Sequence, residues 1–328
     1  MADYEFREYR EGDLPSLLEC FNLVFREGNP DHVDRTESEW DYLFRRNPAG
    51  QRVWLSLHDG RVVGQYAAMP YRVWMAGAER RFAQIVDSMV HPEHRRGLKR
   101  PGLFVQTALP FFDAFGGKDR DWVHYGWPVE NAWRIGKTFL KYEVVRTQTV
   151  VARAPRADAV APAEVEAVTR FDQQARWLYD RCAGEWGAST IRDADFLNWR
   201  FLDNPFYDYT VLGVRDAEGV LRGYAVYRLT DWNQPRTGVI VDWLVPPGEP
   251  EVGELLRDAL DARAATDGAR MLALFLPEWS PWFDRFQEWG FFVWPTDYYM
   301  VGRNFHPRFD MRWLRENWWY QLSDSDLV

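Results

Sequence analysis

The chain has 328 residues, of which 46% are hydrophobic and 27% charged, a profile that suits a globular protein of two ordinary domains. The formal net charge of −9 argues against a general nucleic-acid binder, because such a protein needs a basic face for the phosphates. Only two cysteines are present, which argues against a disulfide scaffold, and the charged start argues against a signal peptide. The apolar runs are shorter than the roughly 18 residues of a membrane helix, which argues against a membrane partner. We therefore expect a cytoplasmic protein without a metal.

The first 150 residues predict an α/β succession that begins with a short strand. Residues 4–9, YEFREY, alternate as a strand does, and Asp13 and Pro15 then open a helix whose apolar residues fall on one face. Pro110 is expected to kink the helix that contains it. The later elements are strands at 52–57, 62–68 and 83–90, a helix from about Gly102 to Phe115, a strand at 122–125 and a helix from Asn131.

Between the strand at 83–90 and the next helix lies a basic turn, VHPEHRRGLKRPGLF at 90–104. A glycine-bearing loop between a strand and a helix is an arrangement that binds phosphate, since the backbone can approach closely and the first N–H groups of the helix point at the anion. A solvated surface loop is the alternative, and the position of the turn favours the ligand. Charge-assisted hydrogen bonds would come from Arg95, Arg96, Lys99 and Arg100.

Two segments of the chain match each other at long range. YLFRRNPAGQRVWLSL at 42–57 and WRFLDNPFYDYTVLGV at 199–214 each place Phe-x-x-Asn-Pro before an apolar strand, and Val-Asp pairs at 86–87 and 241–242 continue the match. Such a series predicts two copies of one α/β unit. The seam falls at 151–167, whose alanines and prolines suit a linker into a helix. We therefore expect an α/β protein with a mixed α+β sheet, built as consecutive domains 1–155 and 156–328, the second a degenerate copy.

The order of elements, with the basic turn after the fourth strand, resembles the GCN5-related N-acetyltransferase (GNAT) superfamily. VHPEHRRG is similar to that family's V-x-P-x-(Y/H)-R-x-x-G, and GWPVENAWRIGKTFL at 126–140 is similar to its strand-to-helix stretch with an asparagine. The resemblance covers most of residues 4–150 and, more weakly through the repeat, about 185–303, so the protein resembles a tandem GNAT.

The resemblance implies that acetyl-CoA or another acyl-CoA is the co-substrate, with its pyrophosphate on the basic turn. The strand at 83–90 would pair with the pantetheine arm, and backbone N–H groups near Met89 and Val90 would polarise the thioester carbonyl. The cofactor-binding residues implied in this way are Met89, Val90, Arg95, Arg96, Gly97, Leu98, Lys99, Arg100, Gly102, Leu103 and Asn131.

The sequence departs from the family pattern in the turn, where Arg95 and Gly97 stand closer together than usual and four residues, 98–101, precede Gly102. In the second copy, PPGEPEVGELL at 246–256 puts glutamates where the first copy has arginines. Acidic groups would repel a pyrophosphate, so we assign cofactor binding to the first copy alone. The second copy would then be a scaffold or supply part of the acceptor site.

Acyl transfer to an amine requires removal of a proton, and four residues are candidates for moving it. Asp87 is one, although Asp242 holds the same place in a copy without the basic turn, which favours a structural role for both. His124 is another, because an unperturbed histidine titrates near neutrality, although a histidine in a strand is more often simply packed.

Glu130 is the third candidate, at the end of the strand that faces the expected thioester. The next residue, Asn131, would contact the cofactor or hold a water by resemblance, and would otherwise cap the helix. Many family members carry a tyrosine general acid further along, where this chain has Thr138 and Phe139. Tyr142, a turn later, is the fourth candidate.

We therefore expect an acyltransferase that moves an acyl group from acyl-CoA to an amine of a small-molecule or peptide acceptor by direct attack, without a nucleic-acid partner. A homodimer is compatible with the sequence. One alternative is a non-catalytic binding or sensor protein that keeps the CoA fold, supported by the altered turn and the displaced tyrosine. The other is an aminoacyl-tRNA-dependent transferase, against which the acidic net charge counts.

Overall fold

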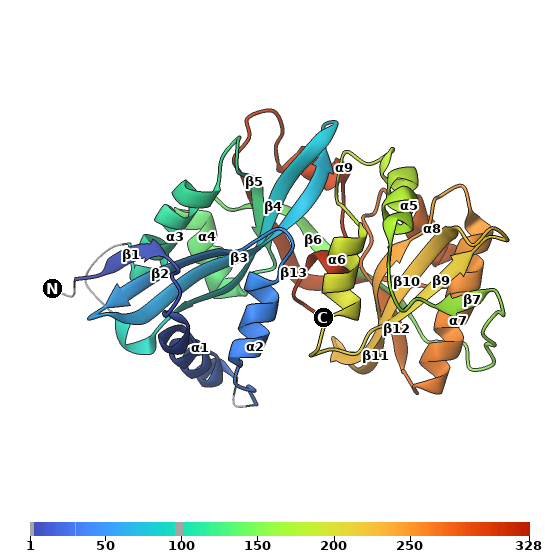
Figure 1. Ribbon diagram of the computed structural model, residues 1–328, viewed down its shortest axis with the longest axis horizontal. Coiled ribbons are helices and arrows are strands. Elements are labelled where there is room, and N and C mark those ends of the chain that lie inside the picture. The colour runs from blue at the N-terminus through green and yellow to red at the C-terminus, as the bar shows by residue number, and fades with distance from the viewer. Residues whose placement is uncertain (1–2, 30, 96–100) are drawn as a thin grey trace. The chain divides into compact units, whose positions relative to one another are not determined.

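The computed structural model describes residues 3–29, 31–95 and 101–328 (Figure 1). The chain forms two compact units that are not consecutive stretches of sequence. Unit 1 comprises Met1–Arg72, Arg80–Arg146 and Tyr298–Met311, and unit 2 comprises Val73–Glu79, Thr147–Asp297 and Arg312–Val328. A linear division at residue 155 therefore differs from the units, because each unit takes a segment from the other part of the chain.

Unit 1 contains the succession of elements that the sequence predicts, β-α-β-β-β-turn-α-β-α. The short helix α2 and the π-helical turn η1 were not predicted from the sequence. Pro110 lies inside α3, which runs on through it. The elements are β1 (Glu5–Glu8), α1 (Leu14–Gly28), α2 (Glu37–Trp40), η1 (Asp41–Arg45), β2 (Arg52–His58), β3 (Arg61–Met75), β4 (Ala78–Val90), η2 (Pro92–His94), α3 (Leu103–Phe115), β5 (Asp121–Gly126), α4 (Glu130–Phe139) and the start of β6 (Glu143–Arg153).

The strands of unit 1 follow the order β1-β2-β3-β4-β5-β13, and the last of these belongs to the C-terminal part of the chain. Strand β13 (Phe292–Asn304) pairs antiparallel with β5 over Val301–Asn304. Strands β4 and β5 are parallel, with a register that runs from Arg81–Asp121 to Gln84–Tyr125, whereas β4 itself continues to Val90. The last six residues of β4 therefore extend beyond its pairing with β5.

Helix α3 covers one face of this sheet because its apolar residues recur at helical spacing. Val105, Ala108, Phe111 and Phe112 are buried against Tyr66 and other residues of the strands. Helix α1 begins with a proline in its first turn and buries Leu14, Leu17, Cys20 and Phe21. These apolar contacts fix the positions of α1 and α3 relative to the carboxyl end of β4.

Unit 2 repeats this plan, with strands in the order β6-β12-β11-β10-β9-β7. Strands β11 and β12 are parallel, as β4 and β5 are in unit 1. Its elements are β7 (Val165–Ala167), α5 (Gln173–Ala183), β8 (Ala188–Thr190), α6 (Ala194–Leu197), η3 (Asn198–Leu202), β9 (Thr210–Arg215), β10 (Leu221–Trp232), β11 (Gln234–Leu244), α7 (Pro250–Thr266), β12 (Met271–Leu274), α8 (Pro281–Glu288), the start of β13, α9 (Met311–Asn317), β14 (Trp318–Trp319) and η4 (Leu322–Asp324).

The internal repeat predicted from the sequence is present in the structure. In each unit a short helix continues as a π-helical turn, η1 or η3, directly before the Asn-Pro sequence and an antiparallel hairpin. The expected linker at 151–167 is shorter than predicted: residues 151–153 belong to β6, 165–167 form β7, and the following helix begins only at Gln173. The fold is thus a mixed α/β fold with two related units.

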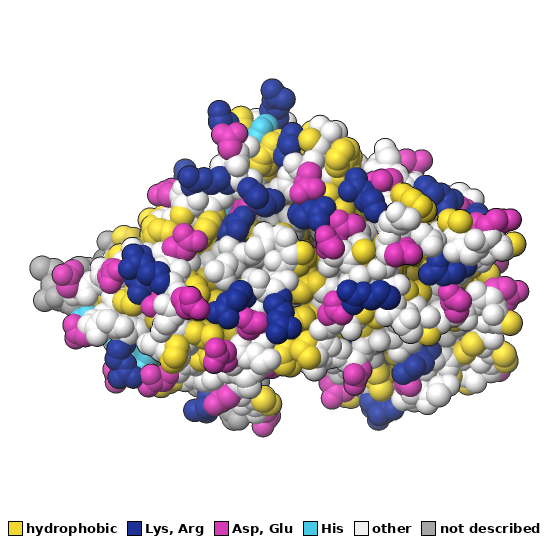
Figure 2. Space-filling view, viewed as in Figure 1, with side chains coloured by type: hydrophobic (Ala, Val, Ile, Leu, Met, Phe, Trp, Pro, Cys, Tyr) yellow, Lys and Arg dark blue, Asp and Glu magenta, His cyan; other side chains and the backbone are white. Residues whose placement is uncertain are grey.

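Side chains of opposite charge are interspersed on the face shown in Figure 2. Among the described residues, no helix combines the length and the apolar character that crossing a bilayer requires.

Candidate functional site

A cavity of about 510 Å³ opens in unit 1 where β4 ends and α3 and α4 begin, and we name it the β4–α4 pocket. Most of its side chains are apolar, and Arg95 is the charged residue among those that the structure describes there. Its lining residues are Val24, Ser88, Met89, Val90, Arg95, Gly102, Leu103, Phe104, Val105, Val129, Asn131, Ala132, Ile135 and Phe139.

The N-terminus of α3 faces this pocket. Gly102 is the N-cap in an extended conformation, and its carbonyl accepts the first helical hydrogen bonds, from the N–H groups of Val105 and Gln106. The N–H groups of Leu103 and Phe104 precede these bonds, so they are among the helix-start donors that need another partner. Together with the positive end of the helix dipole, they suit an anionic ligand.

Arg95 ties the end of β4 to helix α1. Its Nε donates to the Val90 carbonyl at 2.9 Å, and its Nη1 donates to a carboxylate oxygen of Glu27 at 2.6 Å. These two bonds hold the guanidinium at the pocket wall while the side chain stays partly exposed. The remaining N–H donors of the guanidinium suit a phosphate oxygen.

The structure brings together six of the eleven residues named as cofactor-binding, because Met89, Val90, Arg95, Gly102, Leu103 and Asn131 all line the β4–α4 pocket. The other five, Arg96, Gly97, Leu98, Lys99 and Arg100, lie outside the described residues. The apolar wall that α4 supplies was not predicted from the sequence. The spacing of Ala132, Ile135 and Phe139, which puts them on one face of that helix, is the sequence feature that indicates this wall.

The four candidates for proton transfer do not gather in one place. His124 is fully enclosed on β5, with ring contacts to Phe111, Phe112 and Phe305, and its Nε2 lies 3.3 Å from Asp121. Burial lowers the pKa of His124, more than the Asp121 carboxylate raises it. A neutral, enclosed imidazole supports packing rather than contact with an acceptor.

Tyr142 is likewise buried, and its hydroxyl bonds to the hydroxyl of Tyr66. Burial raises the pKa of Tyr142 above its ordinary value of 10, so the phenol stays protonated at neutral pH. The Tyr142 ring also packs against Gly136 of α4, where a Cβ atom would lie only 2.2 Å from the ring. The geometry gives Tyr142 a part in docking α4 on the sheet.

Glu130 stands between two pocket residues, Val129 and Asn131, but its own side chain is exposed and ion-paired with Arg134. Asp87 lies in β4 one residue before the pocket wall, and its carboxylate is ion-paired with Arg35. Of the four candidates, Glu130 is thus the one with a solvent-accessible carboxylate beside the pocket.

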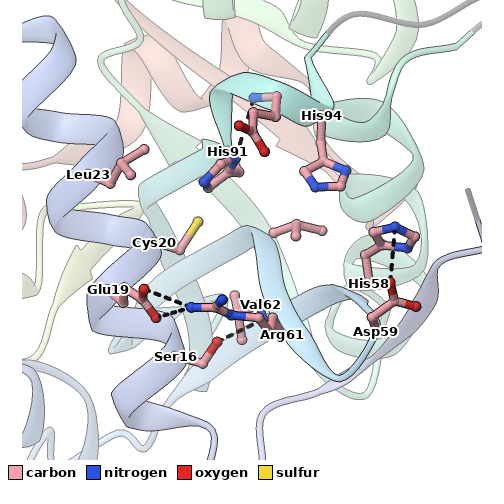
Figure 3. Close-up of a pocket in the computed structure, with 12 residues that line it drawn as sticks. Ser16, Glu19, Cys20, Leu23, His58, Asp59, Arg61, Val62, His91 and His94 are labelled. Atoms are coloured by element: carbon pink, nitrogen blue, oxygen red, sulfur yellow. Dashed lines mark hydrogen bonds and ion pairs between the residues drawn. The ribbon is translucent and has the colours of Figure 1, made fainter.

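A second cavity of about 360 Å³ lies between α1, the β2–β3 hairpin and the turn η2 (Figure 3). The rings of His58, His91 and His94 surround it, with centroids 5.2 Å apart for His58–His94 and 5.7 Å for His91–His94. Burial lowers the pKa of His94, and the neighbouring His58 and His91 lower it further. Within the described ranges, no group of three or more His, Cys, Asp or Glu side chains is arranged to hold a metal ion.

Both cysteines are poor nucleophiles. Cys20 lines this second cavity and Cys182 lies in α5, and burial raises the pKa of each thiol to about 12. At neutral pH both are protonated, and only a thiolate attacks readily.

Unit 2 fills the place that corresponds to the β4–α4 pocket with an indole. Trp282 is the second residue of α8, as Asn131 is the second residue of α4. The Trp282 ring is buried, and its Nε1 donates to the Val245 carbonyl at 2.8 Å, while the matching Val90 carbonyl in unit 1 accepts from Arg95. At the start of α7, the Glu249 carboxylate pairs with Arg181 and Arg222.

Comparisons with known proteins agree with this geometry. Residues 5–101 match the acetyltransferase (GNAT) domain family. No curated protein matches the sequence. A probable N-acyltransferase from Enterococcus faecalis V583 has a similar fold, with 16% identity, a TM-score of 0.61 and coverage of 92% of this chain and 73% of that one.

Two further solved structures share the fold over almost the whole chain. A tandem GNAT protein from the clavulanic acid biosynthesis pathway shows 17% identity and a TM-score of 0.58, covering 94% of this chain and 100% of that one. An N-myristoyltransferase from Saccharomyces cerevisiae with bound myristoyl-CoA shows 10% identity and a TM-score of 0.59, covering 93% and 80%. Residues 5–101 thus match an acetyltransferase (GNAT) domain, and the chain as a whole shares the fold of a tandem GNAT protein.

Proposed function

We propose that the protein transfers an acetyl or other acyl group from acyl-CoA to an amine of a small-molecule or peptide acceptor, by direct attack in a ternary complex. The β4–α4 pocket in unit 1 would hold the acyl-CoA, and unit 2 would be a scaffold or contribute to the acceptor site. The probable N-acyltransferase and the N-myristoyltransferase with bound myristoyl-CoA, which share this fold, support the acyl-CoA part of this proposal.

One observation carries the proposal: a helix start that suits an anion and the part of β4 that extends past its pairing with β5 meet at one apolar pocket. The first N–H groups of α3 and the Arg95 guanidinium suit the phosphates. Residues 88–90 of β4 extend past the pairing with β5, so their backbone can bond the pantetheine amides and the thioester. The apolar face of α4 suits the hydrocarbon parts of the ligand.

In the proposed reaction, the neutral amine nitrogen attacks the thioester carbonyl carbon. The new C–N bond forms as the C–S bond breaks, the CoA thiolate leaves and takes a proton, and the amine gives up its extra proton. Glu130 is the residue we propose to accept that proton, because its carboxylate is exposed beside the pocket. Backbone N–H groups near Met89 and Val90 would stabilise the negative charge on the carbonyl oxygen.

Titration of the purified protein with acetyl-CoA by calorimetry tests the binding site. Arg95→Ala combined with Arg96→Ala is expected to weaken acetyl-CoA binding at least tenfold, since each charge-assisted bond contributes about 1.5–3 kcal/mol. The control is Arg46→Ala, an exposed arginine that pairs with Asp41 away from the pocket. Equal affinity in the double variant and wild type would place the phosphates elsewhere.

Turnover is followed as CoA thiol release from acetyl-CoA with a polyamine, an amino sugar or a dipeptide. Glu130→Gln is expected to lower this rate at neutral pH and to shift the pH dependence upward, because the amine must then lose its proton to the solvent. Tight acetyl-CoA binding without thiol release for any amine would support the non-catalytic binding protein instead.

A further inference from the structure

The backbone of β4 turns unusually one residue before the pocket. Asp87 has φ of +53°, a left-handed conformation that few residues other than glycine, asparagine and aspartate adopt and that is unusual inside a strand. The three residues that follow, Ser88, Met89 and Val90, line the β4–α4 pocket. The conformation of Asp87 therefore sets the direction in which this stretch of backbone faces.

Two side chains from other elements hold Asp87 in this conformation. Arg35, in the loop between α1 and α2, forms an ion pair with the Asp87 carboxylate, and both side chains are mostly buried. Gln65 of β3, which is 1% exposed, donates from Nε2 to the Asp87 carbonyl at 2.9 Å. Arg35 thus holds the side chain of Asp87, and Gln65 holds the peptide group between Asp87 and Ser88.

Arg35 is itself held in place. The Asn22 side chain accepts from the Arg35 backbone N–H at 2.8 Å and donates to the Arg35 carbonyl at 3.1 Å. The guanidinium carbon lies 4.2 Å from the centre of the Phe21 ring. Residues of α1 therefore hold the arginine in place, as a preorganised site requires.

We propose that Arg35 and Gln65 are positioning residues for acyl transfer: they keep Asp87 in the left-handed conformation and so orient the Ser88–Val90 backbone toward the acyl thioester. The proposal rests on the proposed function of the β4–α4 pocket. It assigns the Asp87 carboxylate to Arg35 rather than to proton removal from the acceptor.

The test compares kcat and KM for acetyl-CoA with the amine that gives the fastest thiol release, or with water where no amine exceeds it. Arg35→Met keeps the length of the side chain and removes its charge; we expect kcat to fall at least tenfold while KM and the Kd for free CoA stay within threefold. Asp87→Asn tolerates the left-handed conformation but weakens the ion pair, and should lower kcat similarly. Arg35→Lys is expected to restore part of the lost kcat.

Because the two residues act as a pair, the double variant Arg35→Met/Asp87→Asn should lose no more activity than Arg35→Met alone. The control is Arg26→Met, which removes an exposed arginine of α1 that pairs with Asp34 and should leave kcat unchanged. Gln65→Leu tests the second contact, with an expected fall in kcat and an unchanged Kd for CoA.

An unchanged kcat in Arg35→Met, or a parallel loss of CoA affinity and thermal stability, would overturn the positioning role and leave the proposed function standing. Wild-type protein that binds acetyl-CoA without cleaving it would overturn the proposed acyl transfer and, with it, the positioning role, and would leave only acyl-CoA binding in the β4–α4 pocket. Wild-type protein that fails to bind acetyl-CoA at all would instead overturn the proposed function.

Discussion

His124 is a histidine whose surroundings keep it neutral. Three aromatic rings enclose it, and its one described acidic neighbour, Asp121, already accepts two hydrogen bonds from Arg52, at 2.9 and 3.0 Å. Burial raises the pKa of Asp121, but the hydrogen bonds from His124 and Arg52 outweigh it and leave that pKa below its ordinary value. Asp121 thus keeps its charge at pH values where His124 has none.

This arrangement predicts a stability that falls with acidification. An unfolded histidine has a pKa near 6.5, and the pKa of folded His124 lies lower, so below about pH 6.5 the unfolded chain binds a proton that the folded chain does not. The stabilisation is complete above that pH and decreases as the pH falls. We expect a lower midpoint of thermal unfolding at pH 5.5 than at pH 7.5, measured by circular dichroism.

His124→Phe should make this difference smaller, because the ring keeps its aromatic contacts and loses its proton site. Some pH dependence remains, since the pKa values of His94 and His306 are also lowered by burial. Asp121 keeps its charge throughout this pH range and adds nothing to the slope. An undiminished difference in His124→Phe would show that other groups cause it.

The two units differ at the second residue of the helix that follows the last parallel strand, which is α4 after β5 in unit 1 and α8 after β12 in unit 2. Asn131 leaves a pocket beside α4, whereas Trp282 fills the equivalent place beside α8 and contacts Trp243, with ring centroids 5.2 Å apart. The second residue of the helix is thus one difference between the open pocket and the filled place. Glu249, the residue that precedes α7, has its carboxylate paired with Arg181 and Arg222.

A large residue at position 131 and a small one at position 282 should affect acetyl-CoA binding and the free energy of unfolding separately. Asn131→Trp is expected to weaken acetyl-CoA binding at least tenfold with little change in thermal midpoint, because Asn131 is exposed and the indole would occupy the pocket. Trp282→Ala should cost about 3–5 kcal/mol of unfolding free energy and leave acetyl-CoA affinity unchanged.

Calorimetric titration and denaturant unfolding measure the two effects. Lys137→Trp, which adds an indole to an exposed position of α4 outside the pocket, serves as the control for bulk on that helix. Full acetyl-CoA affinity in Asn131→Trp would contradict the assignment of the pocket.

The sequence predicts those elements well whose signal is local. Helix α1, the hairpin strands, the strand that ends at Val90 and the helix that begins at Leu103 follow from hydrophobic spacing and turn residues. Contacts between residues far apart in the chain do not appear in any local sequence pattern. The Arg35–Asp87 ion pair spans 52 positions, and the enclosure of His124 depends on Phe305 from the C-terminal part. Sequence spacing alone therefore named His124 and Asp87 as candidate bases without showing what their side chains contact.

Truncation of the chain at residue 155 would remove part of unit 1. Unit 1 includes residues 298–311, and strand β13 pairs there with β5 through Val301–Asn304. Met300 and Val301 are completely buried or nearly so, and the Phe305 ring lies so close to Gly116 that a Cβ there would be 2.4 Å away. A fragment that ends at residue 155 lacks all of these contacts and leaves an edge of β5 without its partner.

We therefore expect the fragment 1–155 to be aggregation-prone, because an unpaired strand edge beside exposed apolar groups favours association. Joining residues 298–311 to this fragment through a flexible Gly/Ser linker should restore a cooperative unfolding transition, since the loop-closure cost grows only slowly with linker length. Soluble yield and circular dichroism during heating compare the two fragments with the full chain. The control carries the same linker followed by a scrambled 298–311 sequence. If fragment 1–155 alone unfolds cooperatively and binds acetyl-CoA like the full chain, the strand from the C-terminal part is dispensable and unit 1 ends where the sequence repeat does.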